Sequence, residues 1–420
     1  MAIRVRNRVA STTMLSLGNL SAALLTLVRN ILIARLISVE DFGIASTFAI
    51  AITLIETGTN IGLDRLIVQD RRGGRCGFLA QLHAVQMLRG TVGAGLTLIF
   101  AHIYANLMGL SEHVWAYQCL ALVPLIRGVT HLGIFRAQRI SRFAPFVVTN
   151  IGSNLLAVAV SVPAALWLDD FRAMLLVILV QQTCLVLASH LLGVRRYQLS
   201  WDPKVVRYCL SFGLPLLING FVIFAALGGD QILVGSFLGM ENLGWFAVAF
   251  SMTLVPATVL SNTLQSLFLP GLSRFRANEH MFREQCWTAL RRTLISAVAM
   301  VALLALIGPF AIQLLFGAKY ENASAILPWL AILQGIRVAK AGPAIISIAS
   351  AATTEPLIAN LARLFFLPIA ILWLGAGGGF HAIILTAILG ELAALVTAHG
   401  LLVRRGVLFA PQQSHIVYHA

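Results

Sequence analysis

Ionisable side chains inside long apolar segments are the residues of this sequence best suited to chemistry. Such side chains are costly in an apolar medium and normally face the interior of a helix bundle or a water-filled cavity. Cations outnumber carboxylates among them, so a shared interior is net cationic, and guanidinium groups suit phosphate oxygens. We therefore predict a binding site for an anionic ligand. The candidate ligand-binding cations are Arg29, Arg89, Arg127, Arg337, Lys340 and Arg363, and the carboxylates are Glu56, Asp230 and Glu391.

These charges have other possible roles. A cation can pair within the fold, for example Arg29 with Asp230 or Glu56. Arg363 stands near the end of its apolar segment and can instead extend its guanidinium to the membrane surface. Each carboxylate can serve as a charge partner or can bind a coupling H⁺ or Na⁺, because a buried carboxyl group holds a proton more readily than an exposed one.

Uncharged polar residues accompany the charges at helical spacing. Residues at i, i+3, i+4 and i+7 lie on one face of a helix. The stripes that follow this spacing are Thr53, Glu56, Thr57 and Asn60; Arg127, Thr130 and His131; and Asn150, Ser153 and Asn154. We predict that Asn60, His131, Asn150 and Asn154 line the same polar interior.

The amino-acid composition predicts that membrane-spanning helices position these residues. Of 420 residues, 59% are hydrophobic and only 11% are charged, whereas about a quarter of the residues of a soluble domain are charged. The chain is therefore predicted to be an all-α polytopic membrane protein with little room for a separate catalytic domain. Apolar stretches long enough to cross a bilayer lie at about 12–34, 42–62, 79–105, 114–135, 143–168, 171–194, 208–238, 243–264, 293–316, 322–348, 356–375 and 379–402.

The net charge of +14 reflects topology. Twenty-one of the 30 Lys and Arg residues fall in the segments on one side of the twelve predicted spans, and only Arg35, Arg172 and Lys319 fall on the other. The positive-inside rule then predicts that both termini lie in the cytoplasm. Contact of these basic segments with anionic membrane lipid is expected, and no nucleic-acid partner is needed to explain them.

An internal repeat divides the chain. At an offset of 201 residues, segment 29–43 matches segment 230–244, with identical residues at Ile31/Ile232, Leu32/Leu233, Glu40/Glu241 and Gly43/Gly244. We predict two pseudo-symmetric six-helix lobes, 1–206 and 207–420. Because each lobe has an even number of spans, the lobes should be related by an axis along the membrane normal. Two such bundles facing one another favour a transporter with alternating access.

Motifs of catalysis are missing from the sequence. It contains no GxxxxGK[ST] phosphate loop and no DxD-like metal clamp, and its five cysteines form no CxxC pair. The connections on the side away from the termini are short. We therefore expect no catalytic residues, no metal site and no cofactor, and a transporter rather than an enzyme.

Two groups of residues carry a resemblance to a known family. They are segment 29–43, which closes the first span, and the segments Ser211–Leu216, Gly229–Gly235 and Leu243–Ala249. These resemble the Wzx-type oligosaccharide flippases, the polysaccharide transporter branch of the multidrug/oligosaccharidyl-lipid/polysaccharide (MOP) superfamily, which has a MATE-like fold. The resemblance implies a bacterial inner-membrane carrier that flips a polyprenyl-pyrophosphate-linked oligosaccharide to the periplasmic leaflet, coupled to a cation gradient. It also implies a role in O-antigen, capsule or exopolysaccharide synthesis, beside polymerase or chain-length machinery.

Two other functions stay open at this stage. A MATE-like exporter of drugs or other small molecules would share the fold but should prefer an acidic cavity. A membrane enzyme or scaffold of polysaccharide biosynthesis is the other alternative, although no acid/base pair converges in the sequence.

Overall fold

The protein is helical throughout the part described by the computed structural model, residues 2–276 and 278–407. In these ranges eleven helices are long and apolar enough to cross a membrane, or twelve if one bent pair forms a single span. The predicted all-α membrane fold with about twelve spans is therefore confirmed. The described elements are α1 (Ala2–Leu36), α2 (Val39–Thr59), α3 (Leu63–Gln69), η1 (Arg71–Gly74), α4 (Cys76–Leu107), η2 (Ser111–His113), α5 (Val114–Cys119), α6 (Leu122–Gly128), α7 (Gly133–Arg139), α8 (Ala144–Leu168), α9 (Arg172–Leu191), α10 (Pro203–Leu238), α11 (Met240–Phe275), α12 (Glu279–Phe316), η3 (Ala318–Tyr320), α13 (Glu321–Ala349), α14 (Glu355–Leu364), α15 (Phe366–Gly375) and α16 (Gly379–Arg404).

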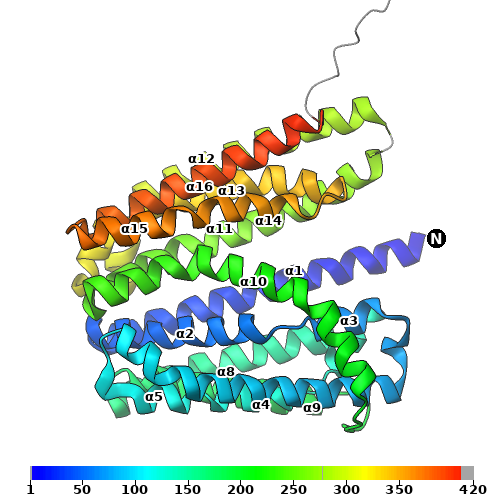
Figure 1. Ribbon diagram of the computed structural model, residues 1–420, viewed down its shortest axis with the longest axis horizontal. Helices are drawn as coiled ribbons and strands as arrows, with labels where there is room; N and C mark the ends of the chain where they lie inside the picture. The colour runs from blue at the N-terminus through cyan, green and yellow to red at the C-terminus, as the bar shows by residue number, and fades with distance from the viewer. Residues whose placement is uncertain (1, 277, 408–420) are drawn as a thin grey trace, which may run out of the picture. The chain divides into compact units, whose positions relative to one another are not determined.

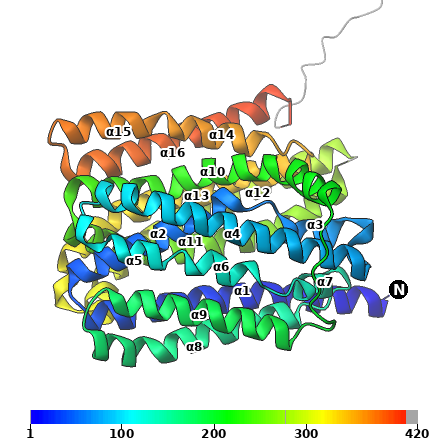
Figure 2. The same ribbon diagram turned by 60° about the horizontal axis from the view of Figure 1, so that its bottom comes forward.

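The helices group into two compact units. The first comprises the chain up to Val248 together with Gln313–Glu321, and the second comprises Ala249–Ile312 together with the chain from Asn322 onward. In the first unit α8 packs between α1 and α9, α4 packs on α6, and α2 packs on α10 (Figure 1, Figure 2). In the second unit α16 packs on α14 and α15. Helix α10, which the sequence assigns to the second lobe, thus contributes to the first unit; the division into lobes at residue 206 stays a prediction.

The repeat glycines lie at a close crossing of α2 and α11. A Cβ added to Gly43 would lie 1.8 Å from the carbonyl oxygen of Met240, and one added to Gly244 would lie 2.3 Å from that of Val39. The contact is reciprocal, because each helix start packs on the backbone of the other. Only glycine leaves room for this approach, which is the physical reason for a glycine in both copies of the repeat.

The fourth predicted span, 114–135, is not one continuous helix. Instead α5, α6 and α7 follow one another, and Ser111–Gly128 meets Gly133–Arg139 at 50°. A break at membrane depth is tolerated only where the protein satisfies the freed backbone groups. Three histidines, from α4, from α9 and from the break itself, do so here.

Side chains bind the backbone on both sides of this break. The ring of His83 accepts the N–H of Leu132 at 3.1 Å, and the ring of His131 accepts the N–H of Gly133 at 2.9 Å. His190 donates to the carbonyl oxygen of Val129 at 2.8 Å. The sequence could not predict the break, because the residues that make it possible come from distant helices.

Candidate functional site

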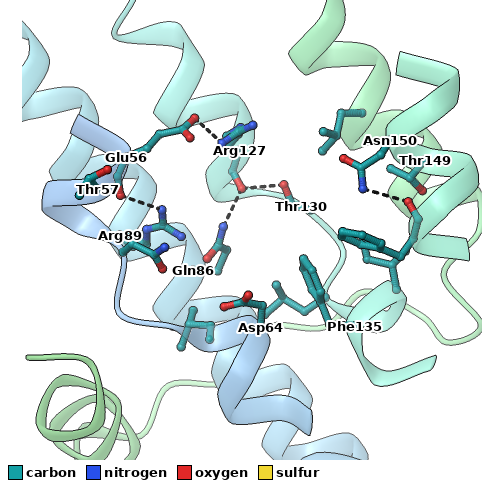
Figure 3. A pocket seen from close by; sticks show the side chains of 16 residues that line it. Glu56, Thr57, Asp64, Gln86, Arg89, Arg127, Thr130, Phe135, Thr149 and Asn150 are labelled. Carbon is teal, nitrogen blue, oxygen red and sulfur yellow. Dashed lines mark hydrogen bonds and ion pairs between the residues drawn. The ribbon is translucent and has the colours of Figure 1, made fainter. Parts of the chain in front are cut away.

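A polar cavity of about 300 Å³ opens within the first unit. Its walls come from α2, α3, α4, α6, α7, α8 and α9, together with residues of the connections between α2 and α3 and between α6 and α7. Figure 3 shows the polar side chains of this wall converging on the space between the helices. The lining residues, which we call the polar cavity, are Glu56, Thr57, Asn60, Leu63, Asp64, Gln86, Arg89, Arg127, Thr130, Leu132, Ile134, Phe135, Phe146, Thr149, Asn150 and Leu185.

Arg127 is the most extensively bound residue of the polar cavity. Its guanidinium forms an ion pair with the carboxylate of Glu56, and its Nε donates to Oε1 of Gln182 at 2.7 Å. Its backbone carbonyl accepts from Nε2 of Gln86 at 3.0 Å and from Oγ1 of Thr130 at 2.8 Å. The side chains of Arg127 and Glu56 remain 33% and 26% exposed, so this ion pair is in contact with the cavity.

Arg89 is held more loosely than Arg127. Its Nη2 donates to the carbonyl oxygen of Glu56 and its Nε to Oγ1 of Thr59, both at 3.5 Å. Hydrogen bonds of this length are weak. The guanidinium of Arg89 therefore has capacity to bind a ligand oxygen at little cost in existing bonds.

The polar cavity is balanced in formal charge. Arg89 and Arg127 line it, but so do Glu56 and Asp64. Asp64 stands on α3, between two spans, and so is not one of the charges predicted inside apolar segments. A net cationic interior is therefore not what this cavity provides.

Arg29 belongs to a separate polar network of the first unit. It is buried on α1, where its Nη1 donates to Oε1 of Gln181 at 2.8 Å and its Nη2 to Oδ1 of Asn30 at 3.1 Å. Gln181 in turn donates to Oδ1 of Asn154 at 3.1 Å, which also accepts from Thr26. The network joins α1, α8 and α9. Glu56 forms its ion pair with Arg127 and not with Arg29, so this one of the two pairings suggested for Arg29 does not form.

The second unit holds three cations around one carboxylate. Glu391 on α16 accepts from Nε of Arg337 at 2.8 Å, from Nζ of Lys340 at 2.6 Å and from Nη1 of Arg363 at 2.6 Å. Lys340 also donates to Oδ1 of Asn360 at 3.0 Å. We call these residues the Glu391 cluster. Its four ionised side chains carry a formal charge of +2 in a buried place.

Arg363 is wholly inside this cluster. Its side chain is only 2% exposed and bonds Glu391, so it does not extend to the membrane surface as one alternative allowed. Spacing of one helical turn, i and i+3, sets Arg337 and Lys340 on the same face of α13. The three helices α13, α14 and α16 thus each supply part of the cluster.

The remaining predicted site residues lie in different places. Asn60 and Asn150 line the polar cavity, whereas Asn154 belongs to the Arg29 network. His131 is buried at the break and does not line the polar cavity. Its ring accepts the N–H of Gly133 and donates to the carbonyl oxygen of Arg195. Asp230 is buried on α10.

Several residues of these sites escaped the sequence analysis. Gln86, Gln181 and Gln182 are amides within apolar spans, and each bonds an arginine or its backbone. Their signal was available, since Gln86 stands three residues before Arg89 and two successive glutamines interrupt an apolar segment. Among the described residues, no group of three or more His, Cys, Asp or Glu side chains could hold a metal ion.

Comparisons with known proteins agree on family and fold. The family described as polysaccharide biosynthesis protein matches residues 32–325. The teichuronic acid biosynthesis protein TuaB of Bacillus subtilis (strain 168) is 23% identical over 267 residues, 62% of this chain. That match spans only 54% of the length of the relative.

Two solved structures have the same fold. The lipid II flippase MurJ in an inward closed conformation superposes with a TM-score of 0.76 at 15% identity, covering 92% of this chain and 87% of MurJ. An inward-facing multidrug resistance MATE transporter of the MOP superfamily gives a TM-score of 0.73 at 14% identity, covering 91% of this chain and 95% of the transporter. The predicted MATE-like fold is therefore confirmed.

Proposed function

The chain belongs to the polysaccharide biosynthesis protein family, and we propose that it flips a polyprenyl-pyrophosphate-linked oligosaccharide from the cytoplasmic to the periplasmic leaflet. The observation that carries the proposal is the polar cavity, where two guanidinium groups stand among amides and hydroxyls. Guanidinium groups bind phosphate oxygens in a bidentate manner, and amides and hydroxyls hydrogen-bond sugar hydroxyls. The fold shared with MurJ and a MATE transporter supports a carrier that works by alternating access.

Arg89 is the residue we assign to first contact with the diphosphate. Its existing hydrogen bonds are 3.5 Å long, so a phosphate oxygen can replace them with shorter, charge-assisted ones. Arg127 can follow when its ion pair with Glu56 opens.

Glu56 is our candidate for coupling to a cation gradient. Among the described residues it forms an ion pair with Arg127 alone, and it is partly exposed, so H⁺ or Na⁺ can compete with Arg127 for its carboxylate. Glu391 is a poorer candidate because three cations at 2.6–2.8 Å hold it, and a fourth cation would be repelled. We therefore assign Glu391 to charge pairing.

The test is the sidedness of lipid-linked oligosaccharide in native membranes, measured with a glycan-modifying enzyme that cannot cross the bilayer. Without the gene, completed units should accumulate on the cytoplasmic side, and the unaltered gene should restore export. Arg89→Gln should fail to restore it. The matched control is Arg71→Gln, which neutralises an exposed arginine outside the cavity. Unchanged sidedness in the deletion strain would refute the flippase.

A second function is favoured by a specific observation. Glu56 and Asp64 give the polar cavity two carboxylates, and carboxylates in a cavity suit an organic cation. A MATE-like exporter of small molecules would therefore lose transport on Asp64→Asn and keep it on Arg89→Gln. The flippase should show the opposite order of sensitivity.

A further inference from the structure

A second cavity of the first unit is apolar. Its volume is about 340 Å³, and its walls come from α2, α4, α10 and the C-terminal end of α5 with the residue that follows it. Phe100, Ile103 and Leu107 on its rim are exposed, as expected for side chains that face lipid. The lining residues, which we call the apolar cavity, are Ala51, Leu54, Ile55, Gly58, Leu96, Thr97, Phe100, Ala101, Ile103, Tyr104, Leu107, Tyr117, Leu120 and Phe221.

The few polar groups of this wall are already bonded to the protein. The hydroxyl of Tyr117 pairs with Oγ1 of Thr47, and that of Tyr104 donates to the carbonyl oxygen of the same threonine at 3.3 Å. Thr97 donates to the carbonyl oxygen of Gly93 at 2.8 Å. A cavity with such walls offers water no partners and is suited to hydrocarbon.

The apolar and polar cavities share α2 and α4 as walls. On α2 they lie on different faces, because Glu56 and Thr57 line the polar cavity while Ile55 and Gly58 line the apolar one. On α4, Leu96 follows Arg89 by seven residues, or about 10 Å of helix. These two residues lie two turns apart on one face of α4, so a molecule whose anionic head contacts Arg89 can extend a long hydrocarbon tail along this helix to the apolar cavity.

We propose that the apolar cavity binds the polyprenyl tail of the lipid-linked substrate while its diphosphate lies against Arg89 in the polar cavity. This inference rests on the proposed function. If the termini are cytoplasmic, as the charge distribution predicts, α2 runs toward the cytoplasm and α4 away from it. The polar cavity then lies near the cytoplasmic surface and the apolar cavity deeper, which matches a lipid entering from the inner leaflet.

The test is photolabelling of the full chain in phosphatidylcholine vesicles. The probe is a long-chain polyprenyl phosphate that carries a benzophenone on its tail, and the adducts are mapped by mass spectrometry. We expect adducts between Leu96 and Leu107 on α4, displaced by unlabelled polyprenyl phosphate and not by phosphatidylglycerol. This measurement needs no variant, so it holds even where a substitution impairs folding.

Two tryptophan variants supply the matched comparison. Leu96→Trp fills the cavity and should reduce labelling there by about tenfold, since a packed site does not accept added volume. Ile99→Trp places the same side chain on the same helix, at a residue that is 67% exposed and outside the cavity wall, and should leave labelling unchanged. Equal loss in both variants would overturn the assignment.

The outcomes separate this inference from the function on which it rests. Adducts on other helices, with export still dependent on Arg89, would refute the tail site and leave the flippase standing. Equal competition by phosphatidylglycerol would assign the cavity to ordinary acyl chains and refute the inference. Adducts on α4 without any effect of the gene on sidedness would refute the flippase alone.

Discussion

Replacing Glu391 with glutamine tests the electrostatics of the second unit most directly. The substitution keeps the size of the side chain and removes the anion that three cations contact at 2.6–2.8 Å. At an effective dielectric constant of about 20, each contact contributes roughly 6 kcal/mol of gross attraction. Desolvation and repulsion among the cations offset most of it, and removing one partner of a buried ion pair typically costs about 3–5 kcal/mol.

The assay is thermal unfolding of the purified chain in detergent. Glu391→Gln should lower the melting temperature far more than Glu284→Gln, which neutralises an exposed glutamate of the same unit. Arg363→Gln should cost less than Glu391→Gln, because it leaves Glu391 in contact with two cations. Equal melting temperatures for Glu391→Gln and Glu284→Gln would refute the account of the cluster as a mutually stabilised group.

Three further predictions concern the first unit. Gly43→Ala forces a Cβ to 1.8 Å from a backbone oxygen and should sharply reduce the yield of folded protein in membranes, whereas Gly271→Ala, with nothing within 4 Å of the added Cβ, should not. His131→Ala leaves a backbone N–H at the broken span without its ring acceptor, at a cost of about 1–3 kcal/mol, and should speed hydrogen exchange across 129–133; the exposed His102→Ala is the control, and equal exchange would contradict the prediction. A side-chain hydrogen bond from Arg72 lowers the pKa of Asp70 from 3.8 to about 2. The stabilising contribution of the Asp70 carboxylate is therefore complete above pH 3.8 and is lost as the pH falls toward 2. The difference in melting temperature between the unaltered chain and Asp70→Asn should therefore shrink over that range, and a constant difference would contradict it.

The membrane architecture could be predicted because each spanning helix is encoded by one continuous apolar segment of the sequence. A run of about twenty apolar residues is both necessary and nearly sufficient for a span. The exception is informative: the apolar run at 114–135 predicts one helix, yet the chain breaks near His131. The break depends on the acceptor of His83 and the donor of His190, which lie on helices distant in the sequence. No local sequence pattern predicts these contacts.

The candidate site was only partly open to prediction. The cost of a charge in an apolar segment singled out Arg89, Arg127 and Glu56, and they do line one cavity. The same criterion passed over Asp64, which lies on α3 between two spans, so the charge balance of that cavity could not be foreseen.

The sequence by itself determined that this is a polytopic helical membrane protein and which costly side chains its apolar segments carry, because hydropathy and charge are properties of single residues and short segments. Which charged side chains pair with one another was decided only by the tertiary structure. Glu391 is more than fifty positions from Lys340 and Arg337 and joins them only because α16 and α13 place their side chains together. Glu56 meets Arg127 for the same reason. Charge pairing depends on distances of a few ångströms, and only the packing of the helices sets those distances.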